Sequence, residues 1–183
     1  MGKFEVTQEQ WQRVMGSNLS RFKGAKNPVE NVSWDDCQEF IQKLNALPAA
    51  KASGFVFRLP TEAEWETACR AGAPKSEDYC LMKGGEQIKA STLSKVARFN
   101  KSWSDGPVAV GSFQPNAWGL YDMHGNVCEW TDTAGGAYRL YRGGSFNFAA
   151  VNCSAGSRSG DRPVYRLGDL GFRLAASGRA ATK

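Results

Sequence analysis

Five residue types are missing from one long stretch of the sequence. Between Phe146 and Leu170 there is no Glu, Lys, Met, Gln or Trp, although all five occur elsewhere in the chain. The missing types share neither size, charge nor polarity, so selection for a loop conformation does not explain their absence. They are the five amino acids that no codon ending in C can specify. The alternative is an ordinary surface loop, rich in Gly and Ser, whose composition is accidental.

Histidine and paired cysteines are also scarce. His124 is the single histidine, and no G-x-S-x-G nucleophile elbow accompanies it, so serine–histidine catalysis is not predicted. The five cysteines are an odd number without a C-x-x-C pair. They therefore predict neither a zinc site nor the disulfide frame of a small secreted domain. Cys37 and Cys69 fall on apolar helical faces and are expected to be buried thiols.

The chain lacks a basic run and a long apolar run. Its net charge of +5 would suit nucleic acid, but Lys and Arg are scattered among acidic residues and no nucleic-acid-binding motif is present. We therefore expect no nucleic-acid partner. No apolar stretch is long enough to span a membrane and no signal peptide is visible, so the compartment is not readable from the sequence.

A chain of 183 residues is expected to form one domain, 1–183. Capping residues followed by helical apolar spacing predict three helices, beginning after Thr7, Ser33 and Thr61. Short apolar or alternating runs predict strands at 54–60, 137–142 and 170–174. Frequent Gly, Pro, Asn and Asp predict irregular loop over most of 73–137 and between the last two strands.

Six pieces of sequence, taken in order, resemble the formylglycine-generating-enzyme (sulfatase-modifying factor) family. They are residues 5–8 (EVTQ), 27–34 (NPVENVSW), 58–66 (RLPTEAEWE), 116–130 (NAWGLYDMHGNVCEW), 142–145 (RGGS) and 171–173 (GFR). The resemblance covers nearly the whole chain. It implies an α+β, C-type-lectin-like fold with short helices around a small twisted antiparallel sheet and much irregular loop. Trp118, Trp130 and Phe172 are expected to be core residues.

The catalytic metal sites of the resembled family are incomplete in this chain. Members that oxidise sulfatase cysteines bind copper through two cysteines after Gly-Gly-Ser, and a thiolate pair suits Cu(I). Cys153 is present here, but Phe148 stands where the other cysteine is expected. Relatives that form sulfur–carbon bonds hold iron through several histidines, and His124 is alone. We expect no catalysis; the alternative is a copper-dependent formylglycine-generating-type oxidase or a degenerate relative of one.

The resemblance also implies one calcium site. In the family the ion is held by the stretch that corresponds to Asp122, Gly125, Val127 and Glu129. Two carboxylates and two backbone carbonyls are the hard oxygen ligands that Ca²⁺ takes. The alternative is that the two carboxylates bond loop amides. A second calcium site of the family is expected to be absent because Gly111 stands where an Asp ligand is expected, and no organic cofactor is expected.

The missing residue types fit a variable region at 146–170. An Asn codon AAC whose adenines are replaced at random never gives the five absent types, and diversity-generating retroelements produce this pattern, often in proteins with the lectin-like fold. Candidate fixed positions are Ser145, Phe146, Ala150, Cys153, Ser154, Ala155, Arg158, Pro163 and Arg166. Candidate variable, ligand-binding positions are Asn147, Phe148, Ala149, Val151, Asn152, Ser157, Ser159, Asp161, Arg162, Val164, Tyr165, Leu167 and Asp169.

A surface that accepts many side chains must contribute little to the core. We therefore expect four residues to lie exposed on one face, with Trp118 and Trp130 buried; the four are Phe148, Asp161, Arg162 and Tyr165. The expected function is non-catalytic binding of a protein or cell-surface ligand. A structural or scaffolding domain in a larger assembly is the third possibility. Analogy with retroelement variable proteins favours display at the cell surface or outside the cytoplasm.

Overall fold

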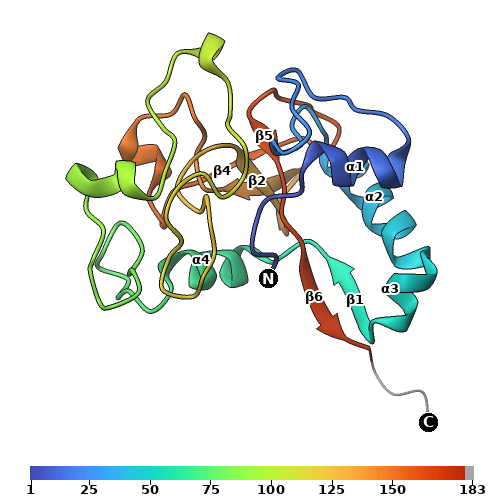
Figure 1. Ribbon diagram of the computed structural model, residues 1–183, viewed down its shortest axis with the longest axis horizontal. Coiled ribbons are helices and arrows are strands. Elements are labelled where there is room, and N and C mark those ends of the chain that lie inside the picture. Colours follow the sequence, from blue (N-terminus) through green and yellow to red (C-terminus); the bar gives the residue numbers. More distant parts are fainter. Residues whose placement is uncertain (180–183) are drawn as a thin grey trace.

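A computed structural model describes residues 1–179 (Figure 1). The last four residues of the expected 1–183 domain lie outside the described residues. The helices are α1 (Gln8–Met15), α2 (Trp34–Ala46), α3 (Pro48–Ala52) and α4 (Glu62–Arg70), with short 3₁₀ turns η1 (Ala90–Lys95), η2 (Trp103–Asp105) and η3 (Ala150–Cys153). The strands are β1 (Phe55–Arg58), β2 (Cys128–Gly135), β3 (Tyr138–Arg142), β4 (Arg158–Asp161), β5 (Leu170–Gly171) and β6 (Ala175–Gly178).

The three predicted helices begin at the predicted capping residues. The Thr7 hydroxyl accepts the Gln10 N–H at 3.3 Å while the Gln10 side chain accepts the Thr7 N–H at 3.0 Å. Ser33 and Thr61 form the same reciprocal arrangement at the starts of α2 and α4. Each capping box satisfies backbone donors that the first turn of a helix leaves unpaired, so the helix starts are encoded locally.

Two small sheets organise the strands. The larger has the order β4-β3-β2-β5, in which β2 pairs antiparallel with β3, β3 antiparallel with β4, and β2 parallel with the short β5. The smaller joins β1 and β6 antiparallel. The fold is therefore α+β, with short helices and much irregular loop, as expected. Figure 1 shows the two sheets in different parts of the molecule, with α4 below the larger sheet and to the left of β6 and β1.

The strand predicted at 170–174 is divided between the two sheets. Leu170 and Gly171 form β5, and the chain then crosses to the smaller sheet, where Ala175 begins β6. Phe172 and Arg173 lie in the crossing and are fully buried. Phe172 packs against aromatic rings of the core, and Arg173 pairs with Glu129. One continuous run in the sequence therefore serves two sheets.

The main core is aromatic. Trp11 stacks on Phe40 with ring centroids 5.2 Å apart, and Phe172 packs edge-on against both rings. Trp130 is also fully buried and donates its indole N–H to the Val32 carbonyl at 3.0 Å. Burial of Trp130 and Phe172 is thus confirmed.

Trp118 is exposed, contrary to the prediction. Its side chain is 56% exposed. Asn116 is buried beside it and accepts the N–H groups of Trp118 and Leu120 at 3.0 and 3.1 Å, and Gly119 has φ 78°. This tight turn anchors its first residue inside and carries the Trp118 ring outward.

Candidate ligand-binding surface

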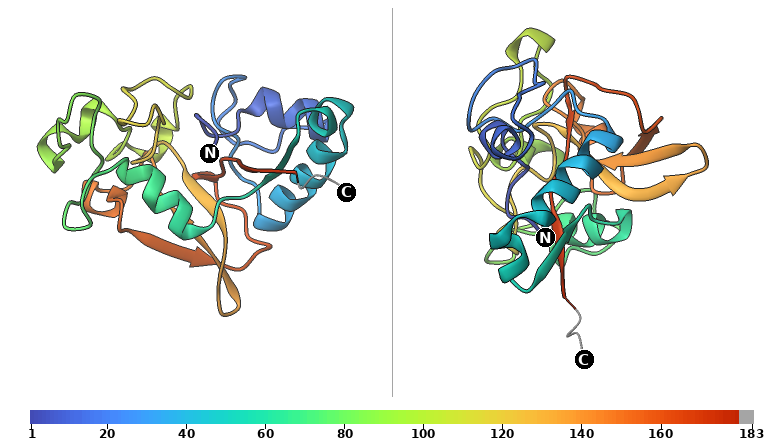
Figure 2. Two further views of the ribbon diagram at one scale, coloured as in Figure 1. Left: turned by 90° about the horizontal axis from the view of Figure 1, so that it is seen from below. Right: turned by 90° about the vertical axis from the view of Figure 1, so that its right-hand side faces the viewer.

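The 146–170 segment supplies β4, one of the two edge strands of the larger sheet. It runs from the end of β3 through η3 and β4 to Leu170, the first residue of β5, which is the other edge strand. Figure 2 (left) shows β4 along the outer side of the molecule. We call residues 1–145 and 171–179 the frame. Part of the segment therefore lies at the surface of the sheet, while Phe146, Cys153 and Ala155 are buried.

Exposure separates most candidate variable positions from candidate fixed ones. The exposed candidate variable residues are Ala149, Val151, Asn152, Ser159, Arg162, Val164, Tyr165 and Leu167. The fully buried candidate fixed residues are Ser145, Phe146, Cys153 and Ala155. Val151 is 70% exposed, Val164 62% and Tyr165 46%. Apolar side chains with this much solvent contact contribute little to the core and are available for a partner.

Five candidate variable residues are less exposed than expected. Phe148 is half-buried because it packs against two core clusters, and Asp161 is half-buried at the end of β4, where it pairs in register with Arg139. Asp169 is only 7% exposed and accepts the Ser145 hydroxyl at 2.9 Å. Asn147 and Ser157 are also half-buried. The prediction that four named residues are exposed is therefore wrong for Phe148 and Asp161 and holds for Arg162 and Tyr165.

The exposed residues other than Ser159, which lies in β4, form two groups rather than one. The first, at η3, consists of Ala149, Val151 and Asn152. The second follows β4 and consists of Arg162, Val164, Tyr165 and Leu167. It lies beside the start of α2, because the Asp35 N–H donates to the Pro163 carbonyl at 3.2 Å. Figure 1 shows η3 and the start of α2 on opposite sides of the sheet, with β4 between them.

Backbone groups of the frame hold the segment in place. The Asn100 N–H donates to the Phe148 carbonyl at 2.8 Å, and the Asn31 N–H donates to the Leu167 carbonyl at 2.9 Å. The Cys128 N–H donates to the Asp169 carbonyl at 2.8 Å. These bonds use main-chain atoms on both sides. They consequently do not depend on which side chain occupies the position in the segment.

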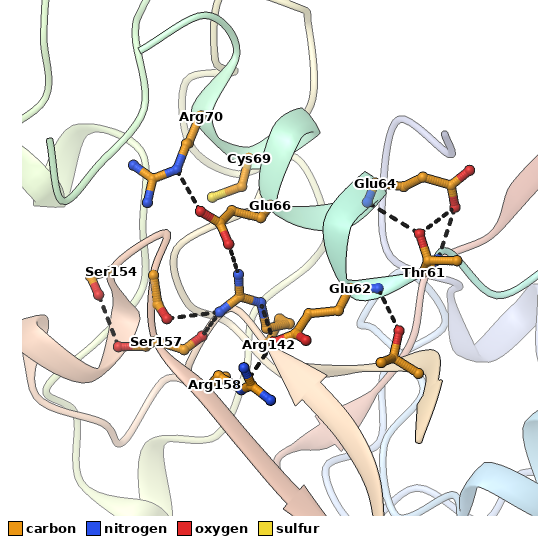
Figure 3. A network of polar contacts seen from close by, with 12 residues as sticks. Thr61, Glu62, Glu64, Glu66, Cys69, Arg70, Arg142, Ser154, Ser157 and Arg158 are labelled. Carbon is orange, nitrogen blue, oxygen red and sulfur yellow. Dashed lines mark hydrogen bonds and ion pairs between the residues drawn. The ribbon is translucent and has the colours of Figure 1, made fainter. Parts of the chain in front are cut away.

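Buried side chains of the frame add further support. Arg142 lies under the segment and donates to the carbonyls of Gly156 and Ser157, while its guanidinium pairs with Glu66 at 2.6 Å (Figure 3). The Tyr79 hydroxyl donates to the Ala150 carbonyl at 3.0 Å. Arg142 is 2% exposed, so its charge depends on these partners.

The imidazole of His124 has a structural role. It is 1% exposed, and burial lowers its pKa to about 4, so the ring is neutral near pH 7. Nε2 accepts the Cys80 N–H at 3.1 Å, which leaves Nδ1 to donate to the Cys153 carbonyl at 2.8 Å. The ring thus ties η3 to the frame.

One ion pair clamps the second exposed group to α2. Arg166 donates from Nε and Nη2 to the two Asp36 oxygens at 2.6 and 2.7 Å. Partial burial opposes ionisation of Asp36, but the bonds from Arg166 and Ser33 outweigh it and lower the pKa of the carboxyl. Candidate fixed residue Arg166 is therefore exposed but held in one position.

The hairpin of β2 and β3 lies beside β4 and extends the surface, which the sequence pattern did not reveal. Arg139 pairs in register with Asp161, and its guanidinium lies 4.0 Å from the ring centroid of Trp34. Tyr138 is 48% exposed at the start of the same strand. The alternation in 137–142 indicated a strand but not which strand would be its neighbour. Strand pairing alone brings Tyr138 and Arg139 to the 146–170 segment.

A shallow depression lies within the surface. It is lined by Phe148, Asn152, Ser157 and Ser159 together with frame residues, and its volume is about 10 Å³. That volume accommodates about one water. A depression of this size does not enclose a small molecule.

The thiols are buried. All five cysteines are free and buried, and burial raises the pKa of Cys153 to about 12. Cys153 is 0% exposed, so its sulfur is a protonated thiol without solvent contact near pH 7. Within residues 1–179 no three His, Cys, Asp or Glu side chains are arranged to hold a metal ion.

The four residues of the implied calcium site do not form a ready oxygen cage. Both Glu129 oxygens accept from Arg173 at 2.6 Å, and one also accepts the Trp65 indole N–H at 2.6 Å. Asp122 accepts the Gly111 N–H at 2.7 Å through one oxygen, while the other is buried without a partner. The unpartnered oxygen of Asp122 is thus suited to bind a cation. Glu129 is not, as long as Arg173 is bound to both of its oxygens. Gly125 and Val127 are buried on the same loop, and the calcium ion stays a prediction.

No helix within residues 1–179 is long and apolar enough to cross a bilayer.

Comparison with known proteins identifies relatives that span the chain. Chaperone protein LppX of Paenibacillus barcinonensis is 32% identical over 97% of this chain and 79% of its own length. The formylglycine-generating enzyme of Mus musculus is 29% identical over 91% of this chain, which spans only 48% of that enzyme. Treponema denticola variable protein 1 has a similar structure, with a TM-score of 0.80 and 31% identity, covering 95% of this chain and 82% of that one.

The family model for the sulfatase-modifying factor enzyme 1-like domain matches residues 1–177. The match includes the larger sheet, the four helices, the whole 146–170 segment and all of the smaller sheet except Gly178. It agrees with the six sequence pieces and with the fold. The chain belongs to the sulfatase-modifying factor enzyme 1-like domain family.

Proposed function

We propose that this chain is a non-catalytic binding domain that presents the 146–170 segment to a protein or cell-surface ligand. One observation carries the proposal: most candidate variable side chains point into solvent while frame atoms hold the backbone beneath them. Exposed Tyr, Arg, Ser and Val side chains on a backbone that is held in place are typical of a protein-binding loop.

The shape of the surface favours a large ligand. Two exposed groups are separated by β4, and the depression between η3 and β4 has a volume of about 10 Å³. A small molecule that bound in this depression would bury little of its own surface. A protein can contact both groups at once and bury the exposed Val and Tyr side chains.

Diversification by a retroelement is the second part of the proposal. The absence of five residue types from 146–170, the separation by exposure and the similarity to Treponema denticola variable protein 1 support it. Sequencing the neighbourhood of the gene tests it. A reverse-transcriptase gene with an adenine-rich near-copy of this segment is expected, and finding neither would contradict diversification without affecting ligand binding.

The number and burial of the thiols in the 146–170 segment argue against copper-dependent catalysis. Phe148 packs into the core where a second cysteine would be needed, and Cys153 is a buried, protonated thiol. Titration with Cu(I) tests this alternative. We expect no tight, stoichiometric binding of Cu(I). Binding of that kind, if the Cys153→Ser variant abolished it, would favour an oxidase.

Randomisation by surface display tests the binding function. One library replaces codons for Val151, Arg162, Val164 and Tyr165 by codons that end in C, and a matched library replaces those for Phe146, Cys153, Ala155 and Leu170. We expect the first library to stay displayed and to yield binders to hen lysozyme as probe. The second should lose display. Equal loss of display in both would contradict a tolerant surface.

A further inference from the structure

Two frame residues, Arg21 and Trp103, lie directly against the 146–170 segment. A Cβ atom on Gly168 would lie 3.3 Å from the Trp103 ring and 3.4 Å from Cδ of Arg21. Both side chains are exposed, and so is the neighbouring Leu167. The second exposed group of the segment therefore continues onto two side chains that the segment does not supply.

Trp103 is held in position although it is partly exposed. Its ring centroid lies 5.8 Å from that of Phe22 and 5.5 Å from that of Phe146, which is fully buried. The Trp103 side chain is nevertheless 37% exposed. An aromatic side chain that is already packed on one side loses little conformational entropy when a partner covers the other side. It is therefore suited to anchor a bound protein.

The guanidinium of Arg21 lies beside two aromatic rings and carries an unpaired charge. Its Cζ atom is 5.5 Å from the ring centroid of Trp103 and 5.9 Å from that of Phe22. Within residues 1–179 it forms no ion pair. The exposed carboxyl of Asp105, which follows on η2, accepts the Ser102 N–H at 3.0 Å instead. The planar set of N–H donors on Arg21 is thus available to an anion.

A buried carboxyl close to Arg21 does not neutralise it. One oxygen of Glu30 would lie 3.5 Å from the same Cβ position on Gly168, yet it has no hydrogen-bond partner. Burial raises the pKa of Glu30 to about 7, so only part of this carboxyl is ionised near pH 7. Lys23 also lies close enough to lower the pKa of Glu30, and it adds a second positive charge. This part of the surface is therefore positively charged.

We infer that Arg21 binds a carboxylate side chain of the protein ligand, while Trp103 packs against an apolar group beside that carboxylate. The inference rests on the proposed function, because the two residues extend the proposed binding surface. A guanidinium can donate two parallel N–H bonds to one carboxylate, which fixes its orientation. The positive charge of Arg21 and Lys23 favours an acidic patch on the ligand. None of the three residues belongs to the 146–170 segment, so the contact is the same whichever side chains the segment carries.

Selection against an acidic protein tests the inference on the full chain. The first display library is selected against bovine β-lactoglobulin, which is acidic, and Arg21→Gln is then introduced into several independent clones. We expect each clone to lose affinity about tenfold, the usual effect of removing a charged partner from an interface. β-Lactoglobulin whose carboxyl groups have been amidated should bind the parent clones as weakly. Unchanged affinity after either modification would overturn the inference.

Matched variants separate the contact from general charge and from folding. Arg13→Gln removes an exposed arginine from α1 and should leave the affinity unchanged, so equal effects of Arg13→Gln and Arg21→Gln would overturn the inference. Trp103→Ala should also weaken binding about tenfold, whereas Trp118→Ala, at another exposed indole, should not. Arg21→Lys keeps the charge without the planar donors and should restore only part of the affinity. Full restoration would contradict a bidentate contact.

The same selection distinguishes this inference from the proposed function. A library without any binding clone would contradict the proposed function, and the inference would fall with it. Clones that bind and are insensitive to Arg21→Gln would overturn the inference alone. Arg21 is exposed, so its replacement should leave the urea denaturation midpoint unchanged and a loss of affinity cannot come from unfolding.

Discussion

Glu30 is a buried carboxyl whose burial is only partly compensated by hydrogen bonds. It is 0% exposed; one oxygen accepts the Phe22 N–H at 2.8 Å and the other has no partner. Burial raises its pKa to about 7, against the opposing effect of bonds from Phe22 and Arg21. The ordinary pKa of a Glu side chain is 4.5, so between pH 4.5 and about pH 7 the folded state binds more protons than the unfolded state. The contribution of Glu30 to stability is therefore lost as pH rises through about 7.

Glu30→Gln should remove this dependence. The amide keeps the shape of the side chain but carries no charge at any pH, so the variant should gain melting temperature relative to the native chain as pH rises from 5 to 8. Thermal denaturation monitored by circular dichroism at several pH values measures the difference. Parallel curves for the two proteins would contradict a raised pKa at Glu30.

The cysteines give a second prediction at the scale of single residues. All five are buried, and burial raises the pKa of Cys80 and of Cys153 to about 12. Because the thiolate is the reactive form, iodoacetamide at pH 7.5 should leave the folded protein unmodified and label it fully in urea. Mass spectrometry after digestion identifies each site. Rapid labelling of Cys153 in the folded protein would show an accessible thiolate and would favour the oxidase alternative.

At the scale of elements, the 146–170 segment combines anchors with exposed positions. Phe146 is 0% exposed and packs edge-on against Phe22, whereas Tyr165 is 46% exposed. Phe146→Ala should cost about 3–5 kcal/mol, the usual loss for truncating a buried aromatic. Tyr165→Ser should change the free energy of unfolding by less than about 0.5 kcal/mol. Urea denaturation measures both; similar losses would show that the exposed positions also carry stability.

The starts of the elements were predictable because their signals are local. Thr7 and Gln10, like Thr61 and Glu64, meet within one helical turn, so their capping boxes could be read from spacing alone. The ends of the strand predicted at 170–174 could not be predicted from local signals. Whether the run after Leu170 stays in one sheet depends on β1 and β2, which precede it by many residues.

At the scale of the whole molecule, one buried ion pair joins distant parts of the chain. Arg173 and Glu129 are both 0% exposed, and their atoms approach to 2.6 Å. The guanidinium also donates to the Tyr121 and Gly2 carbonyls. The pair therefore connects β2, the β5–β6 crossing and the N-terminus.

Removing one partner should be costly. Arg173→Met leaves the Glu129 carboxylate buried without a cation and should destabilise the domain by about 3–5 kcal/mol. The double variant Arg173→Met with Glu129→Gln should recover part of this loss because the uncompensated charge is gone. Calorimetry of the three proteins measures the difference. Failure of the double variant to recover any stability would show that packing, and not charge, is the cost.

The sequence by itself determined the family, the helix starts and the segment to which binding was assigned. Capping boxes, short motifs and missing residue types are properties of neighbouring positions, and they need no knowledge of the remaining chain. The absence of a second cysteine at Phe148 could also be read directly.

Only the tertiary structure decided which side chains face solvent. Trp118 is exposed because a turn anchored by Asn116 carries it outward, and Asp169 is buried because Ser145 reaches it from the other end of the loop. Burial is set by segments that are distant in sequence, so no pattern of neighbouring residues fixes it.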